Sequence, residues 1–253
     1  MNVFDATAWI GPWPFAVLPE HTAASLTKAL REHGVQRALV SPLRAVFAPE
    51  PGPANQALLR RTRSATALTP LPVLNPILPG WRDELDTLAR DQRVRAVRCL
   101  PAYHGYSLRA RELDVVVAAL RERDLRLVIT ARLIDERHEY FALRLKPVPS
   151  TDLAAFLQRH PDWPVLVSGL TFQEALNLAP QHPRLLVDCS FAEWDRTLER
   201  WRETIPADQI VFGSHTPFLV TAATTAKLMT ARLPAREHRA IAAGNLEAFL
   251  CGE

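Results

Sequence analysis

The stretch around His215 has the residue types and spacing of a proton-transfer site. Three apolar residues ending at Phe212 are followed by a glycine, Ser214 and His215, and then by Pro217, which cannot donate to a strand ladder. An imidazole titrates near neutral pH, so His215 could act as a general acid or base. Ser214 beside it suggests a nucleophile with its base, although adjacent strand residues point to opposite faces. The alternative is a hydrogen-bonding plug with a structural role.

Aromatic and basic residues follow two other apolar runs. His104 lies between Tyr103 and Tyr106, where an aromatic face and polar tips could bind a ligand or could pack as a turn. Arg132 precedes Asp135 in a long connection. Its guanidinium could capture a carboxylate or phosphate of a substrate, or it could pair with the acids of that connection and hold it in place.

Arg98 and Asp5 are charged residues within apolar runs, where an unpaired charge would be costly. We expect Arg98 to point into the core towards Asp5 or another acid, as a structural ion pair. Asp5 could orient Arg98 or a catalytic histidine. Other polar or aromatic residues near strand ends are expected to line the pocket, and these are Thr7, Trp9, Asn75, Ser168, Ser190 and Ser214.

Short apolar runs alternate with amphipathic segments along the 253 residues. The runs are solidly apolar, as in parallel strands buried on both faces. The expected strands are Asn2–Trp9, Arg37–Pro42, Thr66–Asn75, Val94–Leu100, Leu125–Leu133, Val165–Leu170, Arg184–Ser190 and Gln209–Ser214. Eight β/α repeats of about 30 residues predict a closed α/β fold, the (β/α)8 TIM barrel, in a single domain over residues 1–253. A doubly wound open sheet is the alternative.

The expected helices are Pro19–His33, Asn55–Ser64, Arg82–Asp91, Leu108–Arg123, Ser150–His160, Thr171–Ala179, Ala192–Ile205 and a tail over Ala222–Leu250 that is broken at Pro234. Ser150 or Thr151 is the expected N-cap of its helix. Trp194, Leu198 and Trp201 recur at helical spacing, which predicts a face packed on the core.

Two connections are longer than usual, Pro42–Pro53 after the second strand and Ile134–Pro149 after the fifth. In a barrel both would lie at the carboxyl ends of the strands, where long loops usually serve a site.

Composition excludes several classes of protein. With 48% hydrophobic residues the chain is not disordered, and no window approaches the roughly 18 apolar residues of a membrane span. The N-terminus reaches charge and a strand too soon for a signal peptide. Three distant cysteines suit a reducing cytoplasm better than a disulfide framework or a zinc knuckle. The net charge of +3 is spread over Arg–Glu helical pairs, so we expect no nucleic-acid or membrane partner. Apolar positions on the last helices could support a homodimer.

Four motifs in order resemble amidohydrolase-related proteins (amidohydrolase family 2). They are Phe4–Phe15 at the first strand, Val97–Tyr106 at the fourth, Phe212–Phe218 at the eighth, and Ala243–Glu247 near the end of the chain. The resemblance implies a TIM barrel of the metal-dependent hydrolase type, whose members hydrolyse or decarboxylate small molecules.

The same resemblance exposes departures at the family's metal ligands. The family has a His-x-His pair ending the first strand, a histidine ending the fifth and the sixth strands, and an aspartate after the eighth. These positions hold Thr7 and Trp9, Thr130 or Ala131, Ser168, and His215. Zinc or manganese needs three or four suitable ligands, so we expect no metal and no other cofactor. An alternative metal site would use His104, His138, His215 and Asp135 or Glu136.

Taken together, these features predict a metal-independent hydrolase of amidohydrolase type acting on a small anionic molecule. In this hypothesis His215 is the acid or base, Arg132 holds the anion, and His104 with its tyrosines positions the substrate. Hydrolysis of a lactone, ester or amide is the first expectation, with decarboxylation and isomerisation as alternatives. The rival hypothesis is a non-catalytic barrel retained for ligand binding or regulation.

Overall fold

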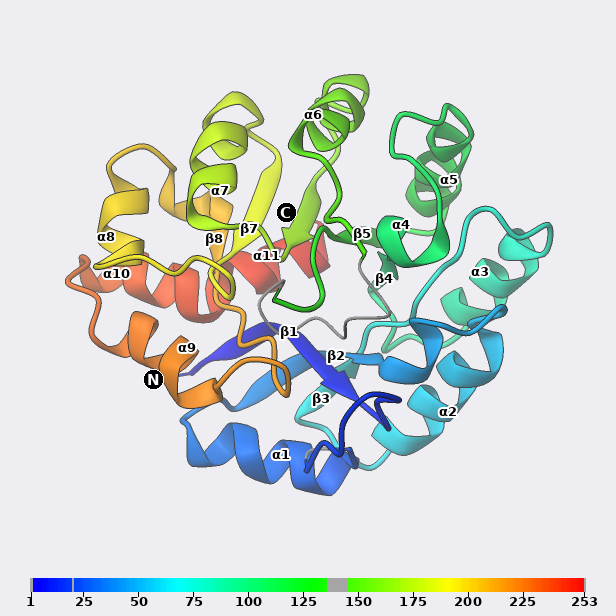
Figure 1. The fold of residues 1–253 in the computed structure, drawn as a ribbon, viewed down its shortest axis with the longest axis horizontal. Helices are drawn as coiled ribbons and strands as arrows, with labels where there is room; N and C mark the ends of the chain where they lie inside the picture. The colour runs from blue at the N-terminus through cyan, green and yellow to red at the C-terminus, as the bar shows by residue number, and fades with distance from the viewer. Residues whose placement is uncertain (1, 20, 136–144, 253) are drawn as a thin grey trace.

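The computed structural model describes residues 2–19, 21–135 and 145–252, and these contain eight parallel strands in the expected order. The strands are β1 (Phe4–Ile10), β2 (Arg37–Pro42), β3 (Leu68–Pro70), β4 (Ala96–Cys99), β5 (Arg126–Thr130), β6 (Val165–Ser168), β7 (Leu185–Asp188) and β8 (Ile210–Val211). They lie inside a ring of helices (Figure 1). β3 is shorter than its expected run because Pro70 and Pro72 cannot donate to a ladder.

Backbone hydrogen bonds close the strands into a barrel. Regular parallel ladders form two sheets, one with the strand order β1-β2-β3 and one with the order β4-β5-β6-β7-β8. At the first seam, Arg98 N–H donates to Pro72 O and Arg98 O accepts from Leu74 N–H, each at 2.8 Å. At the second seam, Trp9 N–H donates to Thr216 O at 2.8 Å and Ala6 N–H donates to Phe212 O at 2.9 Å. The predicted (β/α)8 barrel is therefore confirmed, and the open sheet is excluded.

The α-helices follow the expected segments, except for the short helix Pro101–His104, which was not predicted. They are α1 (Ala23–Glu32), α2 (Gly52–Thr62), α3 (Trp81–Ala89), α4 (Pro101–His104), α5 (Glu112–Glu122), α6 (Ser150–Arg159), α7 (Phe172–Leu178), α8 (Thr197–Arg202), α9 (Thr221–Met229), α10 (Ala235–Arg239) and α11 (Asn245–Cys251). Capping boxes at Thr22 and Thr171 begin α1 and α7 because their hydroxyls accept free backbone N–H groups.

Two local predictions about helices are wrong. Helix α6 begins after Pro149 without a side-chain cap, so neither Ser150 nor Thr151 is its N-cap. Trp194 precedes α8 and is 59% exposed, stacked on Phe172, whereas Leu198 and Trp201 are buried as expected. The helix starts later than its pattern indicated, so Trp194 does not share its core face.

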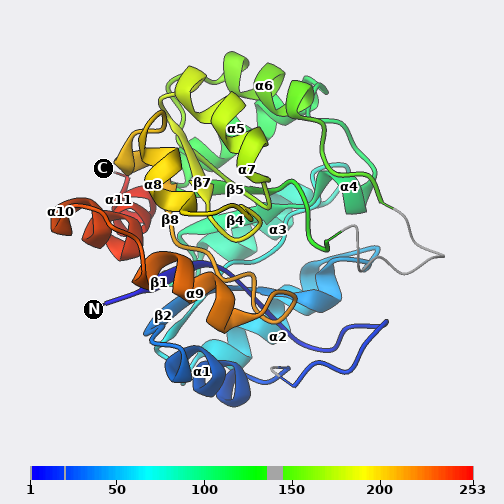
Figure 2. The same ribbon diagram turned by 60° about the vertical axis from the view of Figure 1, so that its left-hand side comes forward.

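The barrel interior changes from apolar to polar along the strands. Inside the barrel, residues from several strands form one apolar cluster with α11, which includes Phe4, Leu39, Leu71, Ala96, Val128, Leu166, Val211, Leu246 and Phe249. Two residues further along their strands, and therefore on the same face, stand Arg98, Thr130, Ser168 and Asp188. Both chain termini lie on the side opposite α4 (Figure 2).

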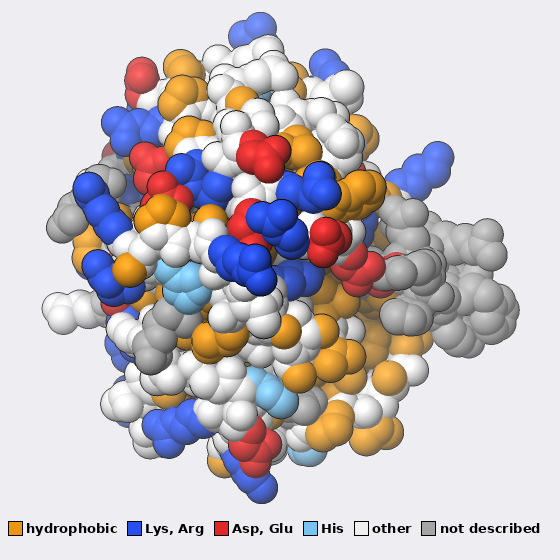
Figure 3. Space-filling model, turned by 90° about the vertical axis from the view of Figure 1, so that its left-hand side faces the viewer, with side chains coloured by type: hydrophobic (Ala, Val, Ile, Leu, Met, Phe, Trp, Pro, Cys, Tyr) orange, Lys and Arg blue, Asp and Glu red, His pale blue; other side chains and the backbone are white. Residues whose placement is uncertain are grey.

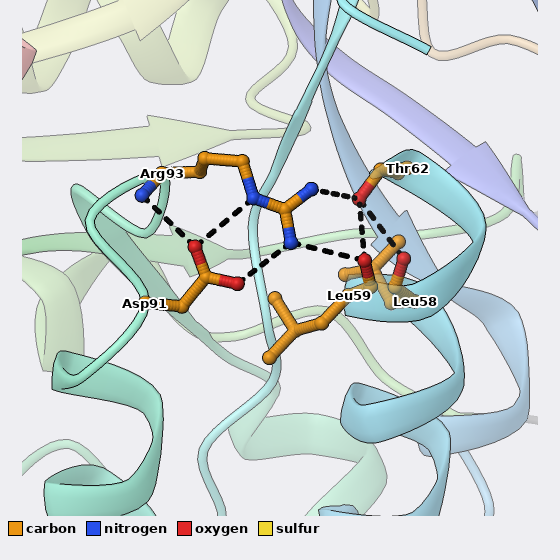
Figure 4. A network of polar contacts seen from close by, with 5 residues as sticks. All are labelled: Leu58, Leu59, Thr62, Asp91 and Arg93. Atoms are coloured by element: carbon orange, nitrogen blue, oxygen red, sulfur yellow. Dashed lines mark hydrogen bonds and ion pairs between the residues drawn. The ribbon is translucent and has the colours of Figure 1, made fainter. Parts of the chain in front are cut away.

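Many charged side chains serve the structure. Arg93, just before β4, donates to Asp91 Oδ2 at 2.6 Å and to Leu59 O of α2 at 3.0 Å (Figure 4). Its guanidinium satisfies a carbonyl near the C-terminal end of α2, where cations are favoured. This contact ties the connection between α3 and β4 to the neighbouring helix.

On the face shown in Figure 3, Lys and Arg side chains are intermixed with Asp and Glu. No helix within the described residues is long and apolar enough to cross a bilayer.

Candidate functional site

The carboxyl end of the barrel contains a buried layer of polar side chains. Asp5 and Thr7 come from β1, Arg98 from β4, Asp188 from β7, and Ser214 from the segment after β8. All five are completely buried. The parallel arrangement brings these carboxyl ends together at one end of the barrel, where catalytic groups of this fold gather.

Asp5 is held by the segment that follows β8. Its Oδ1 accepts hydrogen bonds from the N–H groups of Thr7 and Ser214, each at 2.8 Å, and its Oδ2 accepts a short one from Ser214 Oγ. Burial raises the pKa of Asp5 to about 6, although the hydrogen bonds from Ser214 and Thr7 oppose this rise and Asp188 adds to it. Asp5 therefore titrates close to neutral pH.

Asp188 is a second buried carboxylate, which the sequence reasoning missed. Thr7 Oγ1 donates to its Oδ2 at 2.9 Å, and Ser190 N–H donates to its Oδ1 at 2.9 Å. Burial raises its pKa above the ordinary value, against the lowering effects of Ser190, Thr7 and Arg98. Gly213 permits this approach, because a Cβ there would lie 2.8 Å from Asp188 Cβ. The sequence signal that could have identified Asp188 is an acid at the end of an apolar strand, followed by Cys189 and Ser190.

Arg98 places a guanidinium inside the barrel. Its Cζ lies 4.2 Å from the centroid of the Trp9 ring, a cation–π geometry. Burial lowers the pKa of Arg98 to about 9, while Asp188 and Asp5 raise it. Among the described residues, neither carboxylate comes within ion-pair distance of the guanidinium. The expected direct ion pair of Arg98 with Asp5 or another acid is therefore not formed, and Asp188 and Asp5 act on Arg98 through electrostatic attraction at longer range.

His215 is a neutral, enclosed imidazole. Its ring is completely buried and lies edge-on to Phe191, with centroids 4.8 Å apart, and 6.1 Å from Trp9. Its Nε2 donates to Leu133 O at 2.6 Å, which fixes the tautomer because a carbonyl can only accept. Burial lowers its pKa to about 3, with Arg98 acting in the same direction. At neutral pH it can accept a hydrogen bond at Nδ1, but it is a weak base.

Ser214 and His215 do not form a nucleophile and base in this geometry. Ser214 Oγ bonds to Asp5 and, at 2.7 Å, to Thr216 Oγ1. Thr216 Oγ1 continues to Thr221 Oγ1 at 2.8 Å. Thr221 is partly exposed at the start of α9. A chain of hydroxyls therefore runs from the buried Asp5 towards the surface.

Arg132 lies apart from the polar layer. Its Nη1 donates to Gly169 O at 2.7 Å and to Glu174 Oε2 at 3.1 Å. It lines a cavity of about 510 Å³ together with Asp135, Thr171, Phe172, Gln173, Phe191, Glu193 and Trp194. Glu174 pairs with this guanidinium, and two more acids, Asp135 and Glu193, line the same cavity, so the surroundings give an incoming anion less attraction than the sequence suggested.

His104 and its tyrosines form part of the rim. His104, which ends α4, shares a 3.2 Å hydrogen bond between Nε2 and Ala45 O. Burial lowers its pKa, partly offset by that carbonyl. Tyr103 packs 5.6 Å from Phe47, and Tyr106 is partly buried beside α4. In the described part of the chain, no hydrogen bond or ion pair joins His104 to His215 or Arg132.

The donor set does not fit a zinc or manganese ion. Thr7 is bonded to Asp188, Trp9 offers an N–H donor, and Thr130 Oγ1 pairs with Ser168 Oγ at 3.2 Å. Within the described ranges, no group of three or more His, Cys, Asp or Glu side chains could hold a metal ion. In the alternative ligand set, His138 and Glu136 lie outside the described residues.

A family model described as Amidohydrolase matches residues 6–251. Comparison with curated proteins finds no match.

Three similar solved structures share the fold at low sequence identity. A 2,6-dihydroxybenzoate decarboxylase from Rhizobium is 12% identical, with a TM-score of 0.76 over 99% of this chain and 98% of that one. A probable 2-pyrone-4,6-dicarboxylic acid hydrolase from Acinetobacter baumannii, with citric acid bound, is 15% identical, with a TM-score of 0.69 over 99% and 100%. A 5-carboxyvanillate decarboxylase from Novosphingobium aromaticivorans, with bound manganese, is 11% identical, with a TM-score of 0.73 over 99% and 97%.

Proposed function

The chain belongs to the amidohydrolase family, and we propose that it is a metal-independent member that acts on a small anionic molecule at the carboxyl end of its barrel. Hydrolysis is the primary reaction class, with decarboxylation as the related alternative. The similar structures named above include a hydrolase and decarboxylases of carboxylic acids, which supports both the reaction classes and the anionic substrate.

The observation that carries this proposal is the buried trio of Asp5, Asp188 and Arg98. Burying three ionisable groups in a barrel is costly, and groups with strongly perturbed pKa values collect at functional sites. Asp188 ends β7, Arg98 is next to the end of β4, and Asp5 is hydrogen-bonded to Ser214 after β8. The carboxyl ends of the strands are where barrel enzymes carry out chemistry.

Asp5 takes the acid–base role in this proposal. A group transfers protons most effectively when its pKa is near the working pH, and Asp5, with a pKa of about 6, meets this condition better than His215, with a pKa of about 3. The hydroxyls of Ser214, Thr216 and Thr221 give Asp5 a path for proton exchange with the surface. His215 then acts as a neutral hydrogen-bond acceptor.

The proposal is tested by metal analysis followed by an activity screen. We would treat the purified protein with a chelator, measure zinc and manganese by elemental mass spectrometry, and screen small lactones, esters and aromatic carboxylic acids. A pH indicator follows hydrolysis through proton release, and detection of CO₂ follows decarboxylation. We expect turnover without stoichiometric metal, and loss of turnover in Asp5→Asn. Turnover that requires zinc or manganese would overturn metal independence.

The complete burial of His215 and the Arg132–Glu174 ion pair favour a second candidate, a non-catalytic barrel that binds a ligand. The same screen separates the two. Carboxylates that raise the melting temperature without any turnover would support the binding protein.

A further inference from the structure

Four buried polar atoms beside the polar layer have no hydrogen-bond partner among the described residues. They are Trp9 Nε1, Arg98 Nε, Arg98 Nη1 and His215 Nδ1. Their side chains are neighbours, since Arg98 lies over the Trp9 ring and the Trp9 and His215 rings are 6.1 Å apart. Three of these atoms are N–H donors, and Nδ1 of the neutral His215 is an acceptor. An unsatisfied buried polar group costs more free energy than an ordinary hydrogen bond contributes, so native proteins contain few of them. Four such atoms on three neighbouring side chains indicate a binding site for a polar ligand.

We infer that Arg98 and Trp9 form an oxyanion subsite inside the barrel, with the Arg98 guanidinium as its resident cation and a carboxylate as its ligand class. This inference rests on the proposed function and identifies how the anionic group of the substrate is held. Three N–H groups without partners lie on these two stacked side chains, one of which carries a positive charge. The planar fork of a guanidinium matches the two oxygens of a carboxylate.

The guanidinium is available because the nearby acids are engaged elsewhere. Asp5 accepts from Ser214 and Thr7, and Asp188 accepts from Thr7 and Ser190. Among the described residues, the hydrogen bond of the Arg98 guanidinium is a long one, from Nη2 to Ala6 O at 3.5 Å. Asp5 and Asp188 therefore stabilise the charge of Arg98 without occupying its Nε and Nη1 donors.

The subsite includes a residue at a position where the resemblance implies a metal ligand but where this chain has none. Trp9 and Thr7 hold the positions where the sequence resemblance implies a pair of metal-binding histidines. Arg98 stacks on Trp9 and interacts electrostatically with Asp188, which Thr7 holds. A side-chain cation thus lies against Trp9, at one of those two positions, where it attracts anions as a metal ion would.

The surrounding charges predict coupling between anion binding and protonation. The titratable groups that interact with Asp5 are Asp188, Arg98 and the thiol of Cys189. An anion beside Arg98 adds negative charge near both carboxylates, which favours their protonated forms. Binding should therefore tighten as the pH falls through about 6, where Asp5 takes up its proton.

A chain of ring contacts links the cavity beside Arg132 to this subsite. Phe191 lines the cavity and packs against His215, and His215 packs against Trp9. The subsite therefore lies behind the Phe191 and His215 rings, and a small planar anion is the appropriate probe.

The test uses nitrate and the indole N–H signals of the full-length protein labelled with ¹⁵N-tryptophan. The six tryptophans should give six signals, and Trp9→Phe identifies the Trp9 signal while keeping an aromatic face for Arg98. Trp163 is the matched control, because its buried Nε1 also lacks a partner in the described chain and Arg126 lies 5.4 Å from its ring. We expect nitrate to shift the Trp9 signal to a saturable endpoint and to leave the Trp163 signal unmoved.

Two variants test the assigned residues. Arg98→Met should abolish the response of the Trp9 signal to nitrate. Trp9→Phe should weaken nitrate binding about tenfold or more, with binding measured through the rise in melting temperature that nitrate causes. The Trp9→Phe measurement stands alone if Arg98→Met does not fold. A Trp9 signal that ignores nitrate, or moves only as Trp163 does, would mean an internal water only and would overturn the subsite.

Failure of the subsite and failure of the proposed function give different results. Nitrate binding through Trp9 and Arg98 without turnover of any substrate would support the subsite and contradict the proposed enzymatic function. If turnover is unchanged in Trp9→Phe and the Trp9 signal of the wild type does not shift with nitrate, the protein is an enzyme but the proposed subsite is wrong.

Discussion

The guanidinium of Arg98 stacks on the indole of Trp9 inside the barrel, with 4.2 Å between the Arg98 Cζ and the ring centroid. The backbones of the same two residues take part in closing the barrel at its two seams, through hydrogen bonds of Arg98 with Pro72 and Leu74 and of Trp9 with Thr216. The candidate site and the closure of the fold therefore depend on the same residues. Changes at Arg98 or Trp9 must be tested for stability as well as for binding.

Replacing Arg98 with lysine keeps a cation but removes the planar group that stacks on Trp9. We expect the free energy of unfolding to fall by about 1–2 kcal/mol, measured by urea denaturation at neutral pH. Arg82→Lys is the control, because Arg82 makes a similar contact with Trp81, at 4.5 Å, on the exposed side of α3. That change should cost less than about 0.5 kcal/mol. Equal losses of unfolding free energy in the two variants would contradict the expectation that the buried Arg98–Trp9 contact stabilises the protein more than the exposed Arg82–Trp81 contact.

Asp5 should make stability depend on pH between about 4 and 6. Its folded pKa of about 6 exceeds the ordinary 3.8, so the folded state binds the proton more tightly than the unfolded state. The resulting stabilisation is complete below about pH 4 and is lost as the pH rises through 6. Its full size is on the order of 3 kcal/mol.

Asp5→Asn isolates this dependence. An asparagine can accept from Thr7 and Ser214 N–H through Oδ1 and can donate to Ser214 Oγ, as a protonated Asp5 would. The unfolding free energy of the wild type relative to Asp5→Asn should therefore decrease from pH 4 to 6 and stay level above. A constant difference across this range would show that Asp5 has an ordinary pKa.

His215 should remain neutral throughout the range in which most histidines titrate. Its pKa of about 3 predicts no change in its imidazole signals between pH 5 and 8 in a ¹⁵N-histidine NMR titration. The signals should also report the tautomer protonated at Nε2, which donates to Leu133. His215→Ala identifies the signals. A midpoint between pH 6 and 7 would restore His215 as the general base.

Gly169 should be the most sensitive glycine near the candidate site. Its φ is +83°, and an added Cβ would lie 2.3 Å from Arg132 O. Gly169→Ala should therefore lower the unfolding free energy by more than about 2 kcal/mol, measured by denaturation. Gly105→Ala is the matched control, because its φ is +70° but no atom lies within 4 Å of the added Cβ. Its cost should be that of the backbone conformation, about 1 kcal/mol. Equal losses would remove the steric explanation.

The sequence by itself determined the architecture. Each strand is an apolar run bounded by turn residues, and this pattern follows from local chemistry, which is why all eight strands and their order could be predicted. The resemblance of four ordered motifs gave the family, which the family match confirms. It also marked positions such as Thr7, Trp9 and Ser168 as belonging to one end of the barrel.

Tertiary structure alone decided which of the marked residues share an environment. Burial and pairing depend on contacts between residues far apart in the chain, such as Thr7 with Asp188 and Asp5 with Ser214, and no local pattern encodes these distances. For the same reason the sequence could not show that His215 is enclosed with a depressed pKa. It also could not show that Arg132 pairs with Glu174 while Arg98 keeps donors unpaired among the described residues. The chemistry depends on desolvation and charge in three dimensions, and only the folded barrel establishes both.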